Sequence, residues 1–442
     1  MLSRLAGSFV LLLGALFAQD APKIVSLEPA HGTEVDAKKV AKLVIVFDRA
    51  MNQNGFSLCG GGPAFPKLTR QPAWQDDKTL VAEVELEPDH QYELGINCPA
   101  AQGTRSAEGV PVPSTPWSFG TLPAKLRSAA EQKQRNQKAV EVLLKALAER
   151  YSHRDLRVKD WPALEQQLTA QVLTAKTDRG FAAAAAEALK PTEDLHLFLR
   201  CGEQVFGTGS RSVESLFRRA RVEREVRFFP AGPAALAGRT ADGIGYLMIA
   251  GWTKDLDPEV VGGAITELQD TKAMVIDVRP NGGGDESLAQ RVAAWFVKGT
   301  KAYAKNRYRE RAGKDGFGKV FERTVTGNAA ERRYDHPVAV LTSRHVMSSN
   351  ESFVLMMKQA KDCVVVGQPT FGSSGNPKAF ELGNGVTAVI PTWQDLRLDG
   401  TQFEGEGLPP DVLVPCTAND LETHDPILAK ALELLRAKVG KK

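Results

Sequence analysis

The sequence predicts a multidomain protein in which a β-sandwich and a helical region precede an α/β domain. A chain of 442 residues is too long for one ordinary domain. The period of its hydrophobic residues also changes twice along the chain. Short strand-like runs give way to helical spacing at residue 124, and strands and helices alternate from residue 245. Each change of period indicates a change of architecture.

The composition is that of a soluble globular protein. Hydrophobic residues make up 43% of the chain and charged residues 25%. The 56 basic and 53 acidic side chains nearly balance, giving a net charge of +3 without a long basic block. Because nucleic-acid binding needs a basic patch or stripe, no nucleic-acid partner is expected.

The first 18 residues have the layout of a secretory signal peptide. One arginine precedes an apolar stretch that is too short to span a bilayer, and small residues lead to Ala18. No later stretch is long enough to span a membrane, and no cysteine stands at the expected cleavage point. We therefore expect an exported protein, periplasmic or extracellular, with a signal peptide over residues 1–18 and no stable membrane anchor.

Residues 22–123 are predicted to form the β-sandwich. The strand-like runs are Lys42 to Phe47, Leu80 to Leu86, Tyr92 to Ile96 and Trp117 to Thr121. Several short strands separated by turn residues at this spacing are typical of a sandwich. The phrases SLEPAHGTEV, IVFDRAMN and WSFGT resemble bacterial Ig-like domains that precede exported enzymes.

The five cysteines leave at least one thiol without a partner in the chain. Export permits disulfides. Cys59 and Cys98 both fall in the predicted sandwich, so we expect them to pair. We expect Cys201, Cys363 and Cys416 to be buried thiols.

Residues 124–192 have helical spacing. Val140, Leu143 and Leu147 share one helix face, and an alanine-rich segment ends at Pro191. We expect two to four helices that pack on the domain that follows. His196 comes next, in the lead-in to a predicted strand, where a lone histidine is usually structural.

The α/β domain contains a glycine loop. A buried strand over Ala273 to Val278 leads into Gly282 to Gly284, and a helical pattern follows. Consecutive glycines let the backbone approach a reacting group, and their N–H groups can point at an anion. The loop lacks both GxxxxGK[ST] and GxGxxG, so nucleotide binding is not predicted.

A second strand–turn–helix carries serines. An apolar run, Val338 to Leu341, precedes a turn with Ser348 and Ser349, and helical spacing continues from Phe353 to Ala360. A serine at a helix N-terminus is a candidate nucleophile, because unpaired backbone N–H groups there can stabilise an oxyanion. It can equally be an N-cap. This stretch alone leaves both possibilities open.

Four phrases in order, DVRPNGGG, VLTSRHVMSSNES, VVGQPTFGSSG and DGTQFEGEGLPPDV, resemble the serine peptidases of the C-terminal-processing or tail-specific family, which includes the tricorn core protease. The resemblance implies a ClpP/crotonase-like peptidase core over residues 193–418, followed by a helix over 419–442. It also implies hydrolysis of peptides or unfolded proteins through an acyl-enzyme, with no metal or other cofactor.

The resemblance assigns roles to individual residues. Ser348 falls on the nucleophile of the family, and the oxyanion donors would be the N–H of Ser349 and of Gly283 or Gly284.

The lysine base of the tail-specific branch is replaced here by Ser373. The tricorn-like branch instead uses a histidine and a glutamate, which correspond to His196 in the phrase DLH and to Glu404, with Glu406 as the reserve. A serine hydroxyl needs such a base, and the base needs an orienting partner.

Only about 45 residues separate Arg200 from Gly245, too few for the PDZ module of many relatives. Two alternatives remain open. One is a non-catalytic ligand- or peptide-binding protein on the same fold, and the other is a displaced Ser–Lys dyad that uses Lys378. His345 is a rival base close to Ser348 in sequence. The oligomeric state and the physiological substrate are not predicted.

Overall fold

The computed structural model describes residues 20–209 and 213–440. The chain divides into two compact units, Met1–Gln132 and Lys133–Lys442. The expected signal peptide lies outside the described residues. Among the helices that are described, none has both the length and the apolar character needed to cross a bilayer.

The first unit consists of two β-sheets. One sheet contains, in order, β1 (Ile24–Glu28), β3 (Lys42–Phe47), β7 (Thr79–Glu85) and β5 (Lys67–Leu68), with β6 (Ala73–Trp74) beside β7. The other contains β2 (Glu34–Val35), β9 (Thr115–Thr121), β8 (Gln91–Ile96) and β4 (Leu58–Cys59). The runs predicted as strands are present as β3, β7, β8 and β9, which confirms them.

Both sheets contribute to one apolar core. Leu43 and Ile45 of β3 and Leu94 of β8 belong to the same buried cluster, together with Trp117 of β9. Inward and outward positions alternate along β3 and β7, as the side-chain period of a half-buried strand requires. The unit is therefore a two-layer sandwich. Its Ig-like character stays a prediction.

Cys59 of β4 and Cys98 are joined by a disulfide, with their Cα atoms 6.3 Å apart. Non-reducing peptide mapping should recover the two residues as one cross-linked peptide. Replacing both by alanine should lower the free energy of unfolding of the sandwich by about 2–4 kcal/mol, because the unfolded chain gains freedom. Peptide hydrolysis should not change. Two free thiols, or a link from either cysteine to Cys416, would contradict the pairing.

The second unit begins with helices that cover a four-stranded sheet. The helices are α1 (Ala129–Arg150), α2 (Arg154–Arg157), α3 (Trp161–Leu173) and α4 (Asp178–Leu189), followed by the 3-10 turn η1 (Lys190–Thr192). The sheet order is β11 (Gln204–Gly207), β10 (Phe198–Cys201), β21 (Val386–Pro391) and β20 (Pro377–Glu381). Leu143, Leu168 and Phe181 pack in one core with Leu199 of β10 and Ala388 of β21. This confirms that the helices pack on the following part of the chain.

A seven-stranded sheet forms the centre of the second unit. Its order is β12 (Val226–Pro230), β13 (Ala235–Thr240), β14 (Gly245–Ile249), β15 (Met274–Asp277), β18 (Val338–Thr342), β19 (Cys363–Gly367) and β23 (Val412–Leu413). The pairs from β14 to β23 are parallel. The helices of this part are α5 (Arg219–Val222), α6 (Pro258–Glu267), α7 (Glu286–Ala293), α8 (Ser349–Met357) and α9 (Pro426–Val439).

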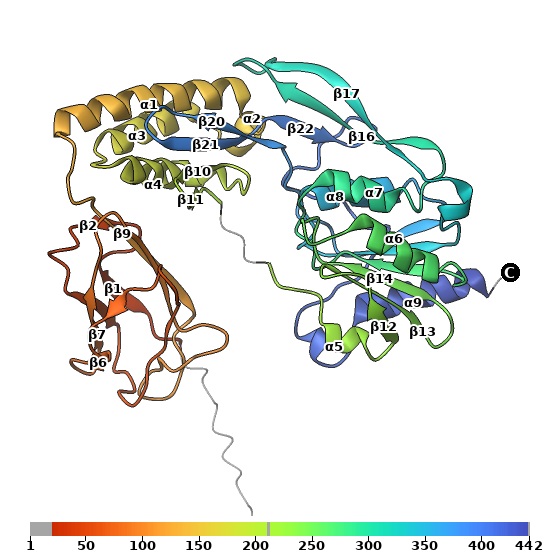
Figure 1. Ribbon diagram of the computed structural model, residues 1–442, viewed down its shortest axis with the longest axis horizontal. Coiled ribbons are helices and arrows are strands. Elements are labelled where there is room, and N and C mark those ends of the chain that lie inside the picture. The colour runs from red at the N-terminus through yellow and green to blue at the C-terminus, as the bar shows by residue number, and fades with distance from the viewer. Residues whose placement is uncertain (1–19, 210–212, 441–442) are drawn as a thin grey trace, which may run out of the picture. The chain divides into compact units, whose positions relative to one another are not determined.

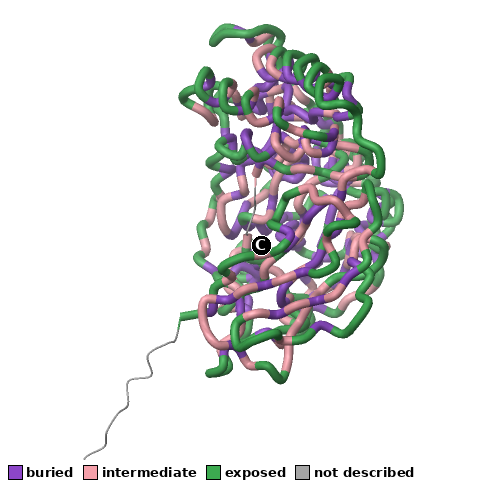
Figure 2. The backbone as a smooth tube through the Cα atoms, turned by 90° about the vertical axis from the view of Figure 1, so that its left-hand side faces the viewer, coloured by how far each residue is buried: buried purple, intermediate pink, exposed green. Residues whose placement is uncertain are grey.

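The helices cover both faces of this sheet. Leu247 of β14 packs in one core with α6, α7 and α8, whereas its neighbour Met248 packs in a second core with α9. Figure 1 shows α9 on the opposite side of the strands from α6, α7 and α8. Because both faces are covered, strands such as β14 are buried at every position. This explains their continuous apolar sequence. Figure 2 colours the backbone by burial, with buried residues in purple.

A long hairpin completes the unit. β16 (Thr300–Arg309) pairs with β17 (Phe317–Thr326) and, on its other side, with β22 (Trp393–Leu396). Short 3-10 turns are η2 (Ala330–Arg332) and η3 (Asp420–Glu422).

The register of the central strands brings the glycine loop and the serine turn together. β15 and β18 are parallel neighbours, with Asp277 opposite Leu341. The segments that follow them therefore leave the sheet at the same edge, where ligands bind in open α/β sheets. The Arg279 side chain is fully buried and bonds both Asp277 and Asp425 at the start of α9. These ion pairs, made by Asp277 and Arg279 of the DVR phrase, thus hold the end of β15 in place.

Candidate active site

Ser348 lies in a strained turn between β18 and α8. Its backbone has φ 57° and ψ −133°, a region that serine rarely adopts. Its amide donates to the Ser373 carbonyl at 2.9 Å and to the Glu351 carboxylate at 3.1 Å. Strain of this kind is concentrated at functional sites, and nucleophilic serines of other hydrolases sit in comparable turns.

Glu351 links the serine turn to the loop of residues 370–375. Its carboxylate also accepts hydrogen bonds from the Thr370 hydroxyl, the Gly372 amide at 2.8 Å and the Ser373 amide at 3.1 Å. Burial raises the pKa of Glu351 to about 8, although these donors act in the opposite direction. The two segments are therefore held as one piece.

The glycine loop lies against Ser348. A Cβ atom on Gly283 would approach the Ser348 Cβ to 2.9 Å, so a larger residue would displace the serine. The Gly283 amide donates to the Asn281 side chain at 2.8 Å. The Gly283 amide, one of the two glycine amides that we expected as an oxyanion donor, is therefore already engaged.

The Gly284 amide is not engaged in the way that the Gly283 amide is. Trp252 donates to the Gly283 carbonyl and accepts from the Asp285 amide, in a parallel bridge to Gly284. Gly283 and Asp285, the neighbours of Gly284, form these two hydrogen bonds. The N–H of Gly284 itself therefore points away from Trp252. The Gly284 amide is the better candidate oxyanion donor of the two glycines.

A cavity of about 370 Å³ opens beside Ser348. Its lining residues are Gly284, Asp285, Glu286, Ser348, Ser349, Ser352, Ser374, Gly375, Asn376, Pro377, Trp393 and Asp395. The candidate nucleophile and both remaining candidate oxyanion donors thus face the same space. Lys378 is exposed and lies outside this lining, which argues against the displaced dyad.

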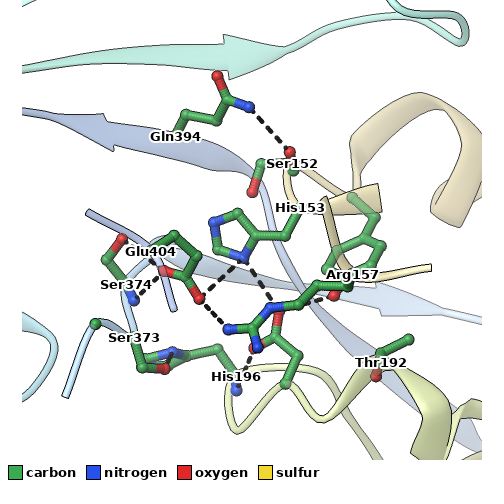
Figure 3. A network of polar contacts seen from close by, with 12 residues as sticks. Ser152, His153, Arg157, Thr192, His196, Ser373, Ser374, Gln394 and Glu404 are labelled. Carbon is green, nitrogen blue, oxygen red and sulfur yellow. Dashed lines mark hydrogen bonds and ion pairs between the residues drawn. The ribbon is translucent and has the colours of Figure 1, made fainter. Parts of the chain in front are cut away.

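His196 reaches the serine turn through Ser373 (Figure 3). It lies in the lead-in to β10, where its amide donates to the Asp194 carboxylate at 2.9 Å. The ring Nδ1 is 3.0 Å from the Ser373 hydroxyl. The carbonyl of the same Ser373 accepts from the Ser348 amide. Burial lowers the pKa of His196, against the effect of Asp194 and Glu404. The buried Ser373 therefore connects the histidine to the serine turn.

Glu404 is the inward glutamate of its loop, whereas Glu406 is exposed. The Glu404 carboxylate accepts from the Ser374 amide at 2.8 Å, is paired with Arg157 and lies 3.5 Å from His153. We expected Glu404 to orient His196 directly. The structure instead places Ser373 on the His196 ring and Glu404 one residue further along, on Ser374.

Sequence reasoning missed His153. This fully buried histidine bonds Asp194 at 3.1 Å, and Asp194 also accepts from the Tyr151 hydroxyl at 2.9 Å. Burial by itself lowers the pKa of His153, but Glu404 and Asp194 outweigh it and raise the pKa. Arg157 and, when it is protonated, His153 balance the two carboxylates. The phrase YSHRDL matches none of the four family phrases, so no sequence signal indicated this cluster.

The same cluster could be taken for a metal site. One ligand atom each from His153, Asp194 and Glu404 lies within 4.8 Å of the others. However, Arg157 and Tyr151 already bind these carboxylates. A guanidinium supplies the positive charge that an ion would bring, so the donor set fits a buried ion-pair network better than a metal.

Glu404→Ala should lower the free energy of unfolding by about 3–5 kcal/mol, because it removes the carboxylate partner of Arg157 and one of the two carboxylates beside the buried His153. Glu406→Ala is the matched control and should change it by no more than about 0.5 kcal/mol. Urea unfolding and peptide hydrolysis measure both variants. A Glu404→Ala variant with wild-type stability and activity would remove Glu404 from the site, and a loss confined to Glu406→Ala would reverse the choice.

Comparisons with known proteins identify a family for part of this chain. The model of peptidase family S41 matches residues 243–414. The carboxy-terminal processing protease CtpB of Bacillus subtilis is 25% identical over 190 residues, which are 42% of this chain and 37% of that protein. The chain thus matches well under half the length of this relative.

Solved structures show the same fold over a longer stretch. A putative peptidase from Parabacteroides merdae has a TM-score of 0.60 at 22% identity, covering 69% of this chain and 96% of that one. Mature CPAF complexed with lactacystin has a TM-score of 0.51 at 12% identity, covering 70% and 100%. The solved structures show the fold, and the family model confirms the predicted resemblance over residues 243–414. Residues 243–414 of this chain form a domain of peptidase family S41, a family of serine-type peptidases.

Proposed function

We propose that the protein is a serine endopeptidase that hydrolyses peptide bonds of peptides or unfolded proteins through an acyl-enzyme. The observation that carries this proposal is the strained Ser348, set at the N-terminus of α8 beside the glycine loop and tied through Ser373 to His196. A helical N-cap alone explains neither the strain nor the histidine.

His196 is the general base in this proposal. Its Nδ1–H donates to the Ser373 hydroxyl, so that Nε2 is the nitrogen that accepts a proton. Nε2 takes the Ser348 hydroxyl proton as Oγ attacks the scissile carbonyl. The imidazolium then protonates the leaving amine when the C–N bond breaks. Water, deprotonated by the same histidine, hydrolyses the acyl-enzyme and releases the new carboxyl terminus.

The oxyanion of the tetrahedral intermediate is bound by the N–H groups of Gly284 and Ser349. Both residues line the cavity, and α8 adds the partial positive charge of its N-terminus. Glu404 and Asp194 act on the imidazolium electrostatically, because both carboxylates favour the protonated ring of His196. Ser373 is a positioning residue for the base.

Export to the periplasm or the extracellular space is part of the proposal, supported by the sequence of residues 1–18. A core without a PDZ insertion is supported by the short segment from Arg200 to Gly245, which contains β11, α5, β12 and β13. We propose no selectivity for C-terminal tails, since tail reading is the role of that module in relatives.

The test is labelling of the purified protein with a fluorophosphonate, together with hydrolysis of a denatured protein substrate. Labelling that maps to the peptide containing Ser348, with turnover that chelators do not affect, is the expected result. Peptide binding without labelling or turnover would favour a non-catalytic binding protein.

A further inference from the structure

The strand β20 forms one edge of the sheet β11-β10-β21-β20. It pairs with β21 on one side, and no described strand pairs with it on the other. Lys378, Ala379 and Glu381 of this strand are exposed. An edge of this kind presents unpaired backbone groups to solvent and can accept another strand.

The backbone groups that face the open side follow from the pairing. Pro377 lies opposite Pro391. Neither proline has an N–H, so this pair cannot be the hydrogen-bonded kind. At the other end of the hairpin, Leu382 donates to the Val386 carbonyl at 2.9 Å, which makes that pair the bonded kind. Bonded and non-bonded pairs alternate along an antiparallel pair of strands. Counting from either end of the hairpin, Ala379 and Val389 form a non-bonded pair. The N–H and C=O of Ala379 point away from β21, into the open edge.

This edge leads into the cavity beside Ser348. Pro377 is the first residue of β20 and also lines the cavity, as do Gly375 and Asn376 before it. The Gly375 carbonyl accepts from the Thr392 amide at 2.7 Å, which holds this entrance against the end of β21. The open edge and the cavity form one continuous path along the backbone.

We propose that an extended segment of the substrate adds to β20 as a new strand, anchored by the N–H and C=O of Ala379, and so delivers its scissile bond to Ser348. The inference rests on the proposed peptidase function and adds the mode of substrate capture. Ala379 lies beyond the residues that line the cavity, so a substrate must supply several extended residues on one side of the scissile bond to reach it. Unfolded polypeptide meets this requirement, whereas folded protein and dipeptides do not.

Ala379→Pro tests the anchor because it removes the outward N–H and leaves the bonds to β21 in place, a substitution that edge strands tolerate. We expect kcat/KM for a ten-residue peptide to fall about tenfold, mainly through KM, as for the loss of one hydrogen bond to substrate. The rate of fluorophosphonate labelling should stay at the wild-type value, since that small probe does not reach β20. Ala379→Val retains the N–H and is the matched control.

A second measurement does not depend on the folding of a variant. Peptides carrying a single N-methyl group at successive positions are compared on the wild-type protein, and KM should rise at alternate positions on one side of the scissile bond. Wild-type kinetics in a folded Ala379→Pro variant, or a flat N-methyl scan, would overturn the inference. Normal labelling with a flat scan refutes only the docking on β20, whereas absent labelling of the wild-type protein refutes the peptidase function.

Discussion

Ser348→Ala should abolish fluorophosphonate labelling and lower kcat for peptide hydrolysis by about 10⁴- to 10⁶-fold, as removal of the nucleophile does in triad hydrolases. The only group removed is the hydroxyl at the N-terminus of α8. The turn itself should persist, because the bonds that hold it come from the Ser348 amide to Ser373 and Glu351. Mass spectrometry of the labelled protein and steady-state hydrolysis measure the two effects.

Ser349→Ala is the matched control. The Ser349 hydroxyl is buried and makes no hydrogen bond in the described part of the chain, so its removal should cost little stability. The backbone N–H proposed as an oxyanion donor remains in this variant, and most of the activity should remain with it. Equal loss in both variants, or loss only in Ser349→Ala, would reject Ser348 as the nucleophile.

His196→Ala should lower kcat/KM by about 10²- to 10⁴-fold through loss of the general base. Burial lowers the pKa of His196 below its ordinary value of 6.5, so the neutral ring that accepts a proton persists as the pH falls. The wild-type enzyme should therefore keep its activity through mildly acidic pH and lose it only below pH 6.5. The acidic limb of the pH profile of kcat/KM measures this loss of activity.

The pH profile of a Ser373→Ala variant tests whether Ser373 positions the base His196 without acting as a catalytic group itself. Loss of the hydroxyl removes the acceptor for Nδ1–H, which disfavours the imidazolium and should move the acidic limb to still lower pH. Activity should fall less than in His196→Ala, and Ser373→Thr should restore it. Full activity in His196→Ala combined with inactivity in Lys378→Ala would establish the displaced dyad instead.

Many local elements of this protein could be predicted from the sequence alone. The alternation of β3 and β7, the apolar runs of β15 and β18 and the segments that follow them depend on neighbouring residues, so period and turn chemistry predict them. The position of Ser348 before α8 and the choice of Glu404 over Glu406 as the inward glutamate came from phrases a few residues long. Such short-range patterns are visible without the fold.

How the groups of the site meet depends on the tertiary structure and could not be predicted from the sequence. His196 contacts Ser373 across 177 positions of sequence, and Arg157 pairs with Glu404 across 247. These contacts depend on how the helices and the sheet of β10 and β21 pack beside the central sheet, and no local period encodes that packing. The hydrogen bond from the Gly283 amide to the Asn281 side chain joins residues only two apart, and its formation depends on the loop conformation that the surrounding core imposes.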